Sequence, residues 1–285
     1  MKPLTGQRPS KLAAGRRHSV WCLPDGTVEA VGHDGAGECH VASWNEIIGV
    51  AAGNVHTSTN TGKSHTVGLQ VDGRVIATGW NAHGQCDLGQ WKNIQSVAAG
   101  WRYTLGAQLD GTVVAAGRNR EGQCDVGQWR GVVAVSCGDW HSIGLTSDGH
   151  ALGAGMARSG QLSISKWSDL VGVSAGYLHT TGLTAQGKVL ATGDNKSGAC
   201  DVTEWRDIVQ VAAGSYHSVG LTVTGRVVAS GSNQHGQCDT GSWTEVVCVA
   251  AGSHHTLGLR ADGIVLATGS NESNQCDTRA LPIVG

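Results

Sequence analysis

The sequence lacks phenylalanine and has three tyrosines and two methionines among 285 residues, so ten tryptophans supply most of its aromatic side chains. No stretch approaches the roughly 18 consecutive apolar residues that a membrane-spanning helix needs. The first twelve residues contain no apolar segment of the kind found in secretory signal peptides. We therefore expect no membrane segment and a cytoplasmic location.

An excess of one charge sign is also missing, because the net charge is -2 and the isoelectric point is about 6.7. Surface binding to nucleic acid or anionic lipid needs a basic footprint. We therefore predict that the partner is neither nucleic acid nor membrane. The basic residues near the N-terminus (Lys2, Arg8, Lys11, Arg16 and Arg17) are interpreted as a short solvated tail.

The nine cysteines cannot all be paired within one chain, because their number is odd. Six recur at one position of a repeat, so each falls in a different structural unit and is interpreted as a small buried hydrophobe. Free thiols indicate a reducing compartment. The six are Cys39, Cys86, Cys124, Cys200, Cys238 and Cys276.

Glycine is abundant, with 44 residues, and it marks an internal repeat. Equivalent glycines stand at positions 15, 53, 100, 138, 176, 214 and 252, separated by 38 residues except for one step of 47. Seven copies at a fixed period are typical of a repeat architecture. We predict one domain over residues 1–285, with residues 54–62 as an insertion in the second repeat.

Each repeat reads as a succession of short strands, as residues 209–239 illustrate. Residues 209–214, 217–221 and 226–230 have the apolar content and alternation of strands. An Asp-Gly pair such as Asp25-Gly26 predicts a two-residue type I′ turn between the second and third strands. Gln237-Cys238-Asp239 is expected to lead into a short fourth strand before Trp243.

Three or four antiparallel strands repeated seven times predict an all-β protein with the architecture of a seven-bladed β-propeller. We expect the N- and C-terminal segments to lie together in one blade and close the ring. The alternative is an open solenoid, which needs polar caps on its terminal repeats, and the sequence shows none.

Two further series recur once per repeat. The tryptophans at 44, 91, 129, 167, 205 and 243 are predicted to pack between blades, and the histidines at 18, 65, 141, 179, 217 and 255 to be structural. Tyr103 replaces the histidine in the third repeat. A metal or catalytic role for the histidines is the alternative.

Residues that differ between repeats are available for binding. The loops after the first and third strands open on one propeller face, and Trp, Tyr and Arg are enriched at protein interfaces. Trp80, Trp101 and Trp140 lie outside the packing series; the alternative is that they cover blade rims. The predicted partner-binding residues are Trp80, His83, Trp101, Arg102, Arg118, Trp140, Tyr177, Tyr216 and His254.

Signals for an enzyme are poor. Gly153 and Gly155 followed by Gly160 have the wrong spacing for a dinucleotide loop. His83 with Cys86 lacks the second half of a zinc site. We expect no catalytic residue, no cofactor and no metal, while dispersed residues meeting in the central channel remain the alternative.

The elements Ala-Gly-x-x-His-Thr/Ser-x-Gly-Leu, Asp-Gly-x-Val and Gly-x-Asn-x-x-Gly-Gln recur along almost the entire chain. In them the chain resembles the regulator of chromosome condensation repeat family, and we interpret it as a bacterial-type member. The Gln-Cys-Asp ending departs from the family's usual Gln-Leu-Gly. The resemblance implies a seven-bladed propeller that binds another protein through one face.

Functions within that family are diverse, and they include nucleotide exchange on a Ran-type GTPase, inhibition of a β-lactamase and UV-B sensing. The photoreceptor's repeated Gly-Trp-Arg-His-Thr motif has a single counterpart here, residues 100–104, which does not support light sensing. We predict a protein-binding module. The alternatives are a guanine-nucleotide exchange factor for a small GTPase, acting through residues 54–62, and a glycan- or small-molecule-binding propeller.

Overall fold

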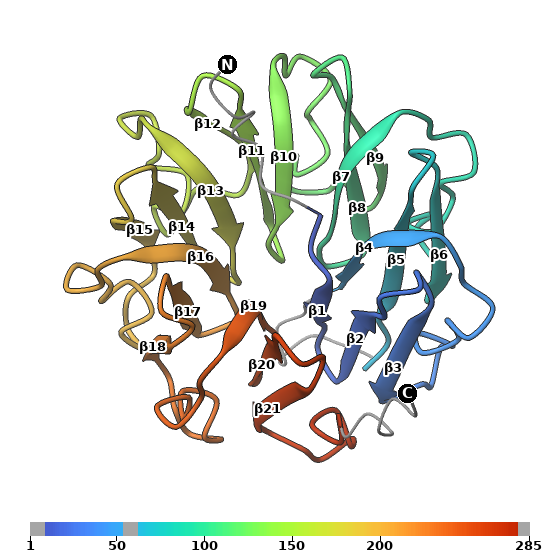
Figure 1. The fold of residues 1–285 in the computed structure, drawn as a ribbon. Coiled ribbons are helices and arrows are strands. Elements are labelled where there is room, and N and C mark those ends of the chain that lie inside the picture. The colour runs from blue at the N-terminus through green and yellow to red at the C-terminus, as the bar shows by residue number, and fades with distance from the viewer. Residues whose placement is uncertain (1–8, 54–61, 279–285) are drawn as a thin grey trace.

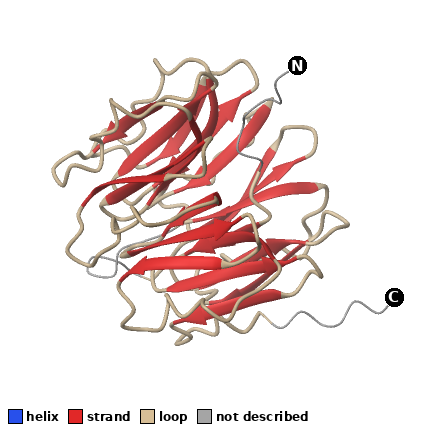
Figure 2. Cartoon of the chain, turned by 60° about the vertical axis from the view of Figure 1, so that its left-hand side comes forward, coloured by secondary structure: helices blue, strands red, loops and turns tan. Residues whose placement is uncertain are grey.

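The computed structural model describes residues 9–53 and 62–278. These residues form 21 strands in seven three-stranded antiparallel sheets arranged as blades around an axis (Figure 1). The described part of the chain is strand and loop throughout, as Figure 2 shows from another side. It therefore includes no helix long and apolar enough to cross a membrane. The predicted all-β, seven-bladed propeller is confirmed.

Consecutive strands form each blade, and the first strand of each blade lies nearest the axis (Figure 1). Blades 1 to 7 are β1 (Leu12–Ala14), β2 (His18–Cys22) and β3 (Val28–Gly32); β4 (Ile47–Ala52), β5 (His65–Gln70) and β6 (Val75–Gly79); β7 (Ile94–Ala99), β8 (Tyr103–Gln108) and β9 (Val113–Gly117); β10 (Val132–Cys137), β11 (His141–Thr146) and β12 (Ala151–Gly155); β13 (Leu170–Ala175), β14 (His179–Thr184) and β15 (Val189–Gly193); β16 (Ile208–Ala213), β17 (His217–Thr222) and β18 (Val227–Gly231); β19 (Val246–Ala251), β20 (His255–Arg260) and β21 (Val265–Gly269).

The turn between the second and third strands differs from the predicted type I′ turn. In blade 1 the Gly26 amide donates to the Leu23 carbonyl at 3.0 Å, and the Leu23 amide donates to the Thr27 carbonyl at 2.9 Å. Only Gly26 has a positive φ, 84°, whereas type I′ needs two such residues. The loop is therefore a three-residue turn that ends in a left-handed glycine.

The predicted fourth strand is wrong, because the Gln-Cys-Asp segments are turns held by side chains. In blade 2, Asn81 accepts the Cys86 amide at 2.7 Å through Oδ1 and donates to Asp87 at 2.7 Å through Nδ2. Gln85 accepts the His83 amide at 3.0 Å. These side-chain bonds occupy the backbone groups that a strand would need.

The segments near the two chain ends close the ring, as predicted, but within the described residues they do not share strands in one blade. Blade 1 consists of β1, β2 and β3, and β1 lies beside β19 of blade 7. The carbonyl of Gln275 accepts a hydrogen bond of 2.6 Å from Ser19, so the segment after β21 is fastened to blade 1. The ring is closed by contact between two complete blades.

The recurring tryptophans pack between blades, as predicted. The ring of Trp205 covers Gly220 of β17 so closely that a Cβ atom there would lie 2.8 Å from the ring. The same contact joins Trp44 to Gly68, Trp91 to Gly106, Trp129 to Gly144, Trp167 to Gly182 and Trp243 to Gly258. In blade 1 the glycine position is occupied by Trp21, which is buried among Leu257 and Val265 of blade 7. Trp21, which projects from β2 of blade 1, therefore fills the boundary between blades 7 and 1.

The repeat glycines stand where neighbouring blades meet most closely. A Cβ atom on Gly176 would lie 2.3 Å from the carbonyl oxygen of Gly214, and one on Gly214 would lie 2.4 Å from that of Gly252. Such contacts are shorter than any non-bonded carbon–oxygen approach, so the ring can close only with glycine at these positions.

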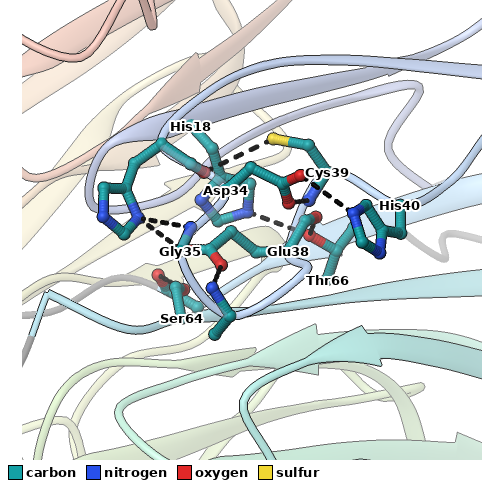
Figure 3. Close-up of polar contacts among 11 residues, drawn as sticks. His18, Asp34, Gly35, Glu38, Cys39, His40, Ser64 and Thr66 are labelled. Carbon is teal, nitrogen blue, oxygen red and sulfur yellow. Dashed lines mark hydrogen bonds and ion pairs between the residues drawn. The ribbon is translucent and has the colours of Figure 1, made fainter.

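The recurring histidines connect the blades. Nε2 of His18 lies 2.9 Å from the Thr66 hydroxyl, which donates to the Glu38 carbonyl at 2.6 Å (Figure 3). That hydroxyl has a single hydrogen, so it accepts from His18, which is therefore protonated on Nε2. Equivalent contacts of 2.9–3.0 Å join five more histidines to the next blade: His65 to Thr104, His141 to Thr180, His179 to Ser218, His217 to Thr256 and His255 to Ser19. The histidines are structural, as predicted.

All nine cysteines are free. Cys86 illustrates the six repeat cysteines: it is half-buried, and its Sγ lies 3.6 Å from the Trp80 carbonyl. Burial, with a smaller effect of Asp87, raises the pKa of the Cys86 thiol to about 12. These thiols are therefore protonated and poorly nucleophilic at neutral pH.

Candidate protein-binding face

The nine residues predicted to bind a partner all lie on one face of the propeller. They belong to the loops that follow the first and third strands of blades 2 to 7, and these loops open on the side opposite the Asp-Gly turns. The structure groups eight of them, together with His235, into two clusters. We call them the tryptophan–arginine stack (Trp80, Arg102, Trp101, Arg118 and Trp140) and the tyrosine–histidine cluster (Tyr177, Tyr216, His254 and His235).

In the tryptophan–arginine stack, aromatic rings alternate with guanidinium groups across three blades. The Arg102 guanidinium lies 4.5 Å from the ring centroids of both Trp80 and Trp101. Arg118 lies 4.5 Å from Trp101 and 5.4 Å from Trp140, and the Trp101 and Trp140 centroids are 4.5 Å apart. Each cation–π contact contributes roughly 0.5–2 kcal/mol, depending on its exposure.

The backbone of Arg102 is strained to reach this position. Among the described residues at the same loop position, Arg102 alone has a positive φ, 67°. A left-handed backbone at a non-glycine residue costs roughly 1–3 kcal/mol and persists where the surroundings hold it. Here the two tryptophan rings hold the guanidinium between them. Arg118 is held separately by two hydrogen bonds to Glu121.

His83 lies at the edge of this stack. Its ring is perpendicular to that of Trp80 at a centroid distance of 5.5 Å, and its Nε2 is 3.3 Å from Nη1 of Arg102. Partial burial, together with the charges of Arg102 and Arg118, lowers the pKa of His83. His83 is therefore neutral at physiological pH, and its Nε2 accepts a hydrogen bond from Arg102.

Exposure divides the members of the stack into two groups. Trp101 is only 6% exposed, so it forms the buried base on which the arginines pack. Trp80, Arg102 and Trp140 are partly exposed, and His83 is exposed. Trp80, Arg102 and Trp140 therefore present accessible surface, while Trp101 supports them from below.

The tyrosine–histidine cluster extends the same face over blades 5 to 7. The rings of Tyr177 and Tyr216 meet edge to face at 5.6 Å, and Tyr216 is stacked on His254 at 6.3 Å. His235 reaches His254 from the next loop, with centroids 4.7 Å apart. Burial, followed by Tyr177 and Asp139, raises the pKa of Tyr216 to about 12. Its hydroxyl therefore stays protonated at neutral pH.

Between the two clusters the structure corrects one sequence interpretation. Arg16, expected in a solvated tail, is only 6% exposed and occupies the same loop position as Trp101 and Asp139. Its Nε and Nη1 atoms are covered and make no hydrogen bond. The sequence does indicate the loop position of Arg16, because Arg16 directly follows the repeat glycine Gly15 as Trp101 follows Gly100.

Two hollows bear on the small-molecule alternative. The axial channel, lined by the first strands of the blades, has an open volume of only about 160 Å³. A larger cavity of about 790 Å³ lies on the opposite face, between the turns of blades 7 and 1, and Trp21, Leu23, Leu259 and Ile264 line it. Sequence reasoning missed this cavity. Its signal was Trp21 at the strand position that glycine occupies in the other blades, such as Gly220 in blade 6.

Other predictions concern metals and the insertion. Within residues 9–53 and 62–278, no group of three or more His, Cys, Asp or Glu side chains is placed to hold a metal ion. Residues 54–61 of the predicted insertion lie outside the described residues. The role of residues 54–62 therefore stays a prediction.

Seven closed three-stranded blades with loop-borne residues on one face define the protein as a seven-bladed β-propeller. Residues 132–161, 170–199, 208–237 and 246–275, in four consecutive blades, match the family model of the regulator of chromosome condensation (RCC1) repeat. These blades are RCC1 repeats, which confirms the resemblance seen in the sequence. No curated protein matches the chain.

Solved structures show the same fold at low sequence identity. The Physcomitrella patens receptor kinase CR4 ectodomain has a TM-score of 0.72 at 16% identity, covering 92% of this chain and 73% of its own. Human WBSCR16 has a TM-score of 0.68 at 17% identity, covering 93% and 87%. Prp20p of Saccharomyces cerevisiae has a TM-score of 0.64 at 18% identity, covering 82% and 74%.

Proposed function

We propose that this protein is a non-catalytic, cytoplasmic binding module that holds a protein partner on the face carrying the tryptophan–arginine stack. The observation that carries the proposal is the alternation of Trp80, Arg102, Trp101, Arg118 and Trp140 over three blades. None of these tryptophans belongs to the packing series between blades. The fold therefore does not account for their presence.

The physical character of the stack suits a protein interface. Trp and Arg dominate the binding energy of interfaces because they bury large areas and still hydrogen-bond at their edges. The stack fixes these side chains before a partner arrives, which lowers the entropy cost of binding. The arginines keep their charge, so the expected partner surface combines apolar and acidic groups.

Affinity capture from a lysate of the source cells tests this proposal. We expect a protein retained by the wild type to be lost by the Trp80→Ala/Trp140→Ala variant. Leu109→Ala/Val223→Ala is the matched control, because both residues are 69% exposed beside the turns of the opposite face. A protein retained equally by all three chains would contradict the assignment of this face.

Guanine-nucleotide exchange on a small GTPase is the second candidate. It is supported by the RCC1 repeats and by the structural similarity to Prp20p, whose binding to Gsp1p and histones was characterised with its structure. In this reading the chain displaces nucleotide and magnesium without covalent chemistry. Faster nucleotide release from a captured GTPase, lost on deletion of residues 54–62, is the expected result.

A small-molecule or glycan ligand is the third candidate, and the cavity of about 790 Å³ on the opposite face favours it. Drug-sized ligands occupy pockets of roughly 300–1,000 Å³ lined mainly by apolar groups. Binding to an immobilised sugar panel or a small-molecule library, lost on Trp21→Ala, would support it. That the chain is a bacterial-type family member stays a prediction from the sequence.

A further inference from the structure

Arg16, which is buried in blade 1, lines a pocket at the boundary of blades 7 and 1. We call this hollow of about 130 Å³ the Arg16 pocket. It is lined by Arg16, Arg17, His235, His254, Ser273 and Glu272, among others. It is much smaller than the roughly 300–1,000 Å³ of a drug-sized site, so it fits a single functional group.

Arg16 is a charged side chain whose hydrogen-bonding capacity is not used. It is 6% exposed, and its Nε and Nη1 donors have no partner. Burying a cation without hydrogen-bond acceptors is costly, so native structures nearly always supply acceptors. The repeat does not require arginine here, because Trp101, Asp139 and Ser215 occupy the equivalent position in other blades.

The surrounding charges do not compensate for this burial. Burial and the neighbouring Arg17 lower the pKa of Arg16, and Asp139 offsets only part of this effect. Arg17 adds a second cation to the wall of the pocket, against the exposed carboxylate of Glu272. Two hydroxyls, on Ser270 and Ser273, provide further donors. An anion entering the pocket would meet more donors than acceptors.

We infer that the Arg16 pocket is a binding site for one anionic oxygen group, a carboxylate or a phosphate. Such a group would accept hydrogen bonds from the guanidinium of Arg16, which lines the pocket, because arginine donates readily to carboxylates and phosphates. The Ser273 hydroxyl and the His254 ring border the same space. This site is separate from the tryptophan–arginine stack, so the inference does not depend on what the stack binds.

Titration of the full chain with inorganic phosphate and with succinate, against sodium chloride of equal ionic strength, tests the inference. We expect either anion to raise the melting temperature progressively with its concentration, because ligand that binds the native state stabilises it. Phosphate alone acting would identify a phosphate site, and both acting would identify a site for carboxylate as well. Equal melting temperatures in all three salts would overturn the inference.

Two substitutions with opposite expected effects on anion affinity make the test specific. Arg16→Gln should weaken binding by roughly tenfold or more, since it removes the charged donors. Glu272→Gln should strengthen binding about two- to threefold, because it removes an exposed carboxylate from the rim. Arg158→Gln is the control, an exposed arginine outside the pocket.

Glu272→Gln keeps the inference testable if Arg16→Gln does not fold, because Glu272 is exposed. The affinities are compared by isothermal titration calorimetry. Unchanged affinity in Glu272→Gln, or equal affinities in Arg16→Gln and wild type, would show general salt stabilisation and no site at Arg16.

Discussion

Nε2 of His217 lies 2.9 Å from Oγ1 of Thr256, across the boundary between blades 6 and 7. The Thr256 hydroxyl donates to the Gln237 carbonyl at 2.7 Å. Thr256 of β20 therefore joins β17, through His217, to the segment that follows β18, through Gln237. Both partners are fully buried. This arrangement recurs at six of the seven blade boundaries, so we expect the stability of the propeller to depend on it.

Stability should fall steeply on mild acidification. Burial, the largest cause in each case, lowers the pKa of His18, His65 and His179 to about 4 and that of His141, His217 and His255 to about 3. The unfolded histidines titrate near 6.5, so the unfolded chain binds more protons below that pH. The stability that the fold has while its buried histidines and those of the unfolded chain are all neutral is therefore fully present above about pH 6.5. It is lost as the pH falls toward 4.

Each histidine that stays neutral in the fold contributes up to about 1.4 kcal/mol per pH unit to this loss. Urea unfolding measured at intervals between pH 7 and pH 5 should show the free energy of unfolding decreasing with a slope equivalent to several protons. A free energy that stays constant over this range would contradict the burial of neutral histidines.

Thr256→Val should destabilise the protein by about 2–4 kcal/mol. The substitution keeps the shape of the side chain but leaves two buried polar groups, Nε2 of His217 and the Gln237 carbonyl, without their partner. Thr203→Val is the control, because Thr203 is exposed. Denaturant unfolding compares the two, and equal stabilities would show that the hydroxyl is dispensable.

Gly220→Ala should destabilise the protein by about 1–3 kcal/mol through overpacking. The added methyl group would lie 2.8 Å from the Trp205 ring, which is itself held between blades. Gly241→Ala is the matched control, because a Cβ atom there meets nothing within 4 Å. Thermal unfolding of the two variants should show a loss for the first and no loss for the second.

The repeat made most of the fold predictable, because each unit repeats the same contacts. The packing of the tryptophans between blades and the structural role of the histidines were predicted from their recurrence once per repeat. The fourth strand was wrongly predicted because the Asn81 side chain binds the Cys86 amide and the Asp87 carboxylate, a local competition that apolar alternation does not reveal. The sharing of one blade by both chain ends was wrongly predicted, because β1, β2 and β3 already complete blade 1 from N-terminal residues.

The candidate face was predictable as a set of loops but not as an arrangement of side chains. Trp80, Trp101 and Trp140 were placed on one face because the loops after the first and third strands open on the same side. Their alternation with Arg102 and Arg118 depends on side-chain directions and on the left-handed backbone of Arg102, which the sequence does not specify. Arg16 was misassigned because a run of basic residues usually is a solvated tail.

The affinity of the purified partner for three chains tests the proposed face most directly. Trp80→Ala/Trp140→Ala should raise the dissociation constant by at least about thirtyfold, the loss expected for a central aromatic contact. Leu109→Ala/Val223→Ala should leave it within about twofold of the wild type. Unchanged binding by the tryptophan variant, with its native circular dichroism retained, would contradict the claim that the tryptophan–arginine stack binds the partner.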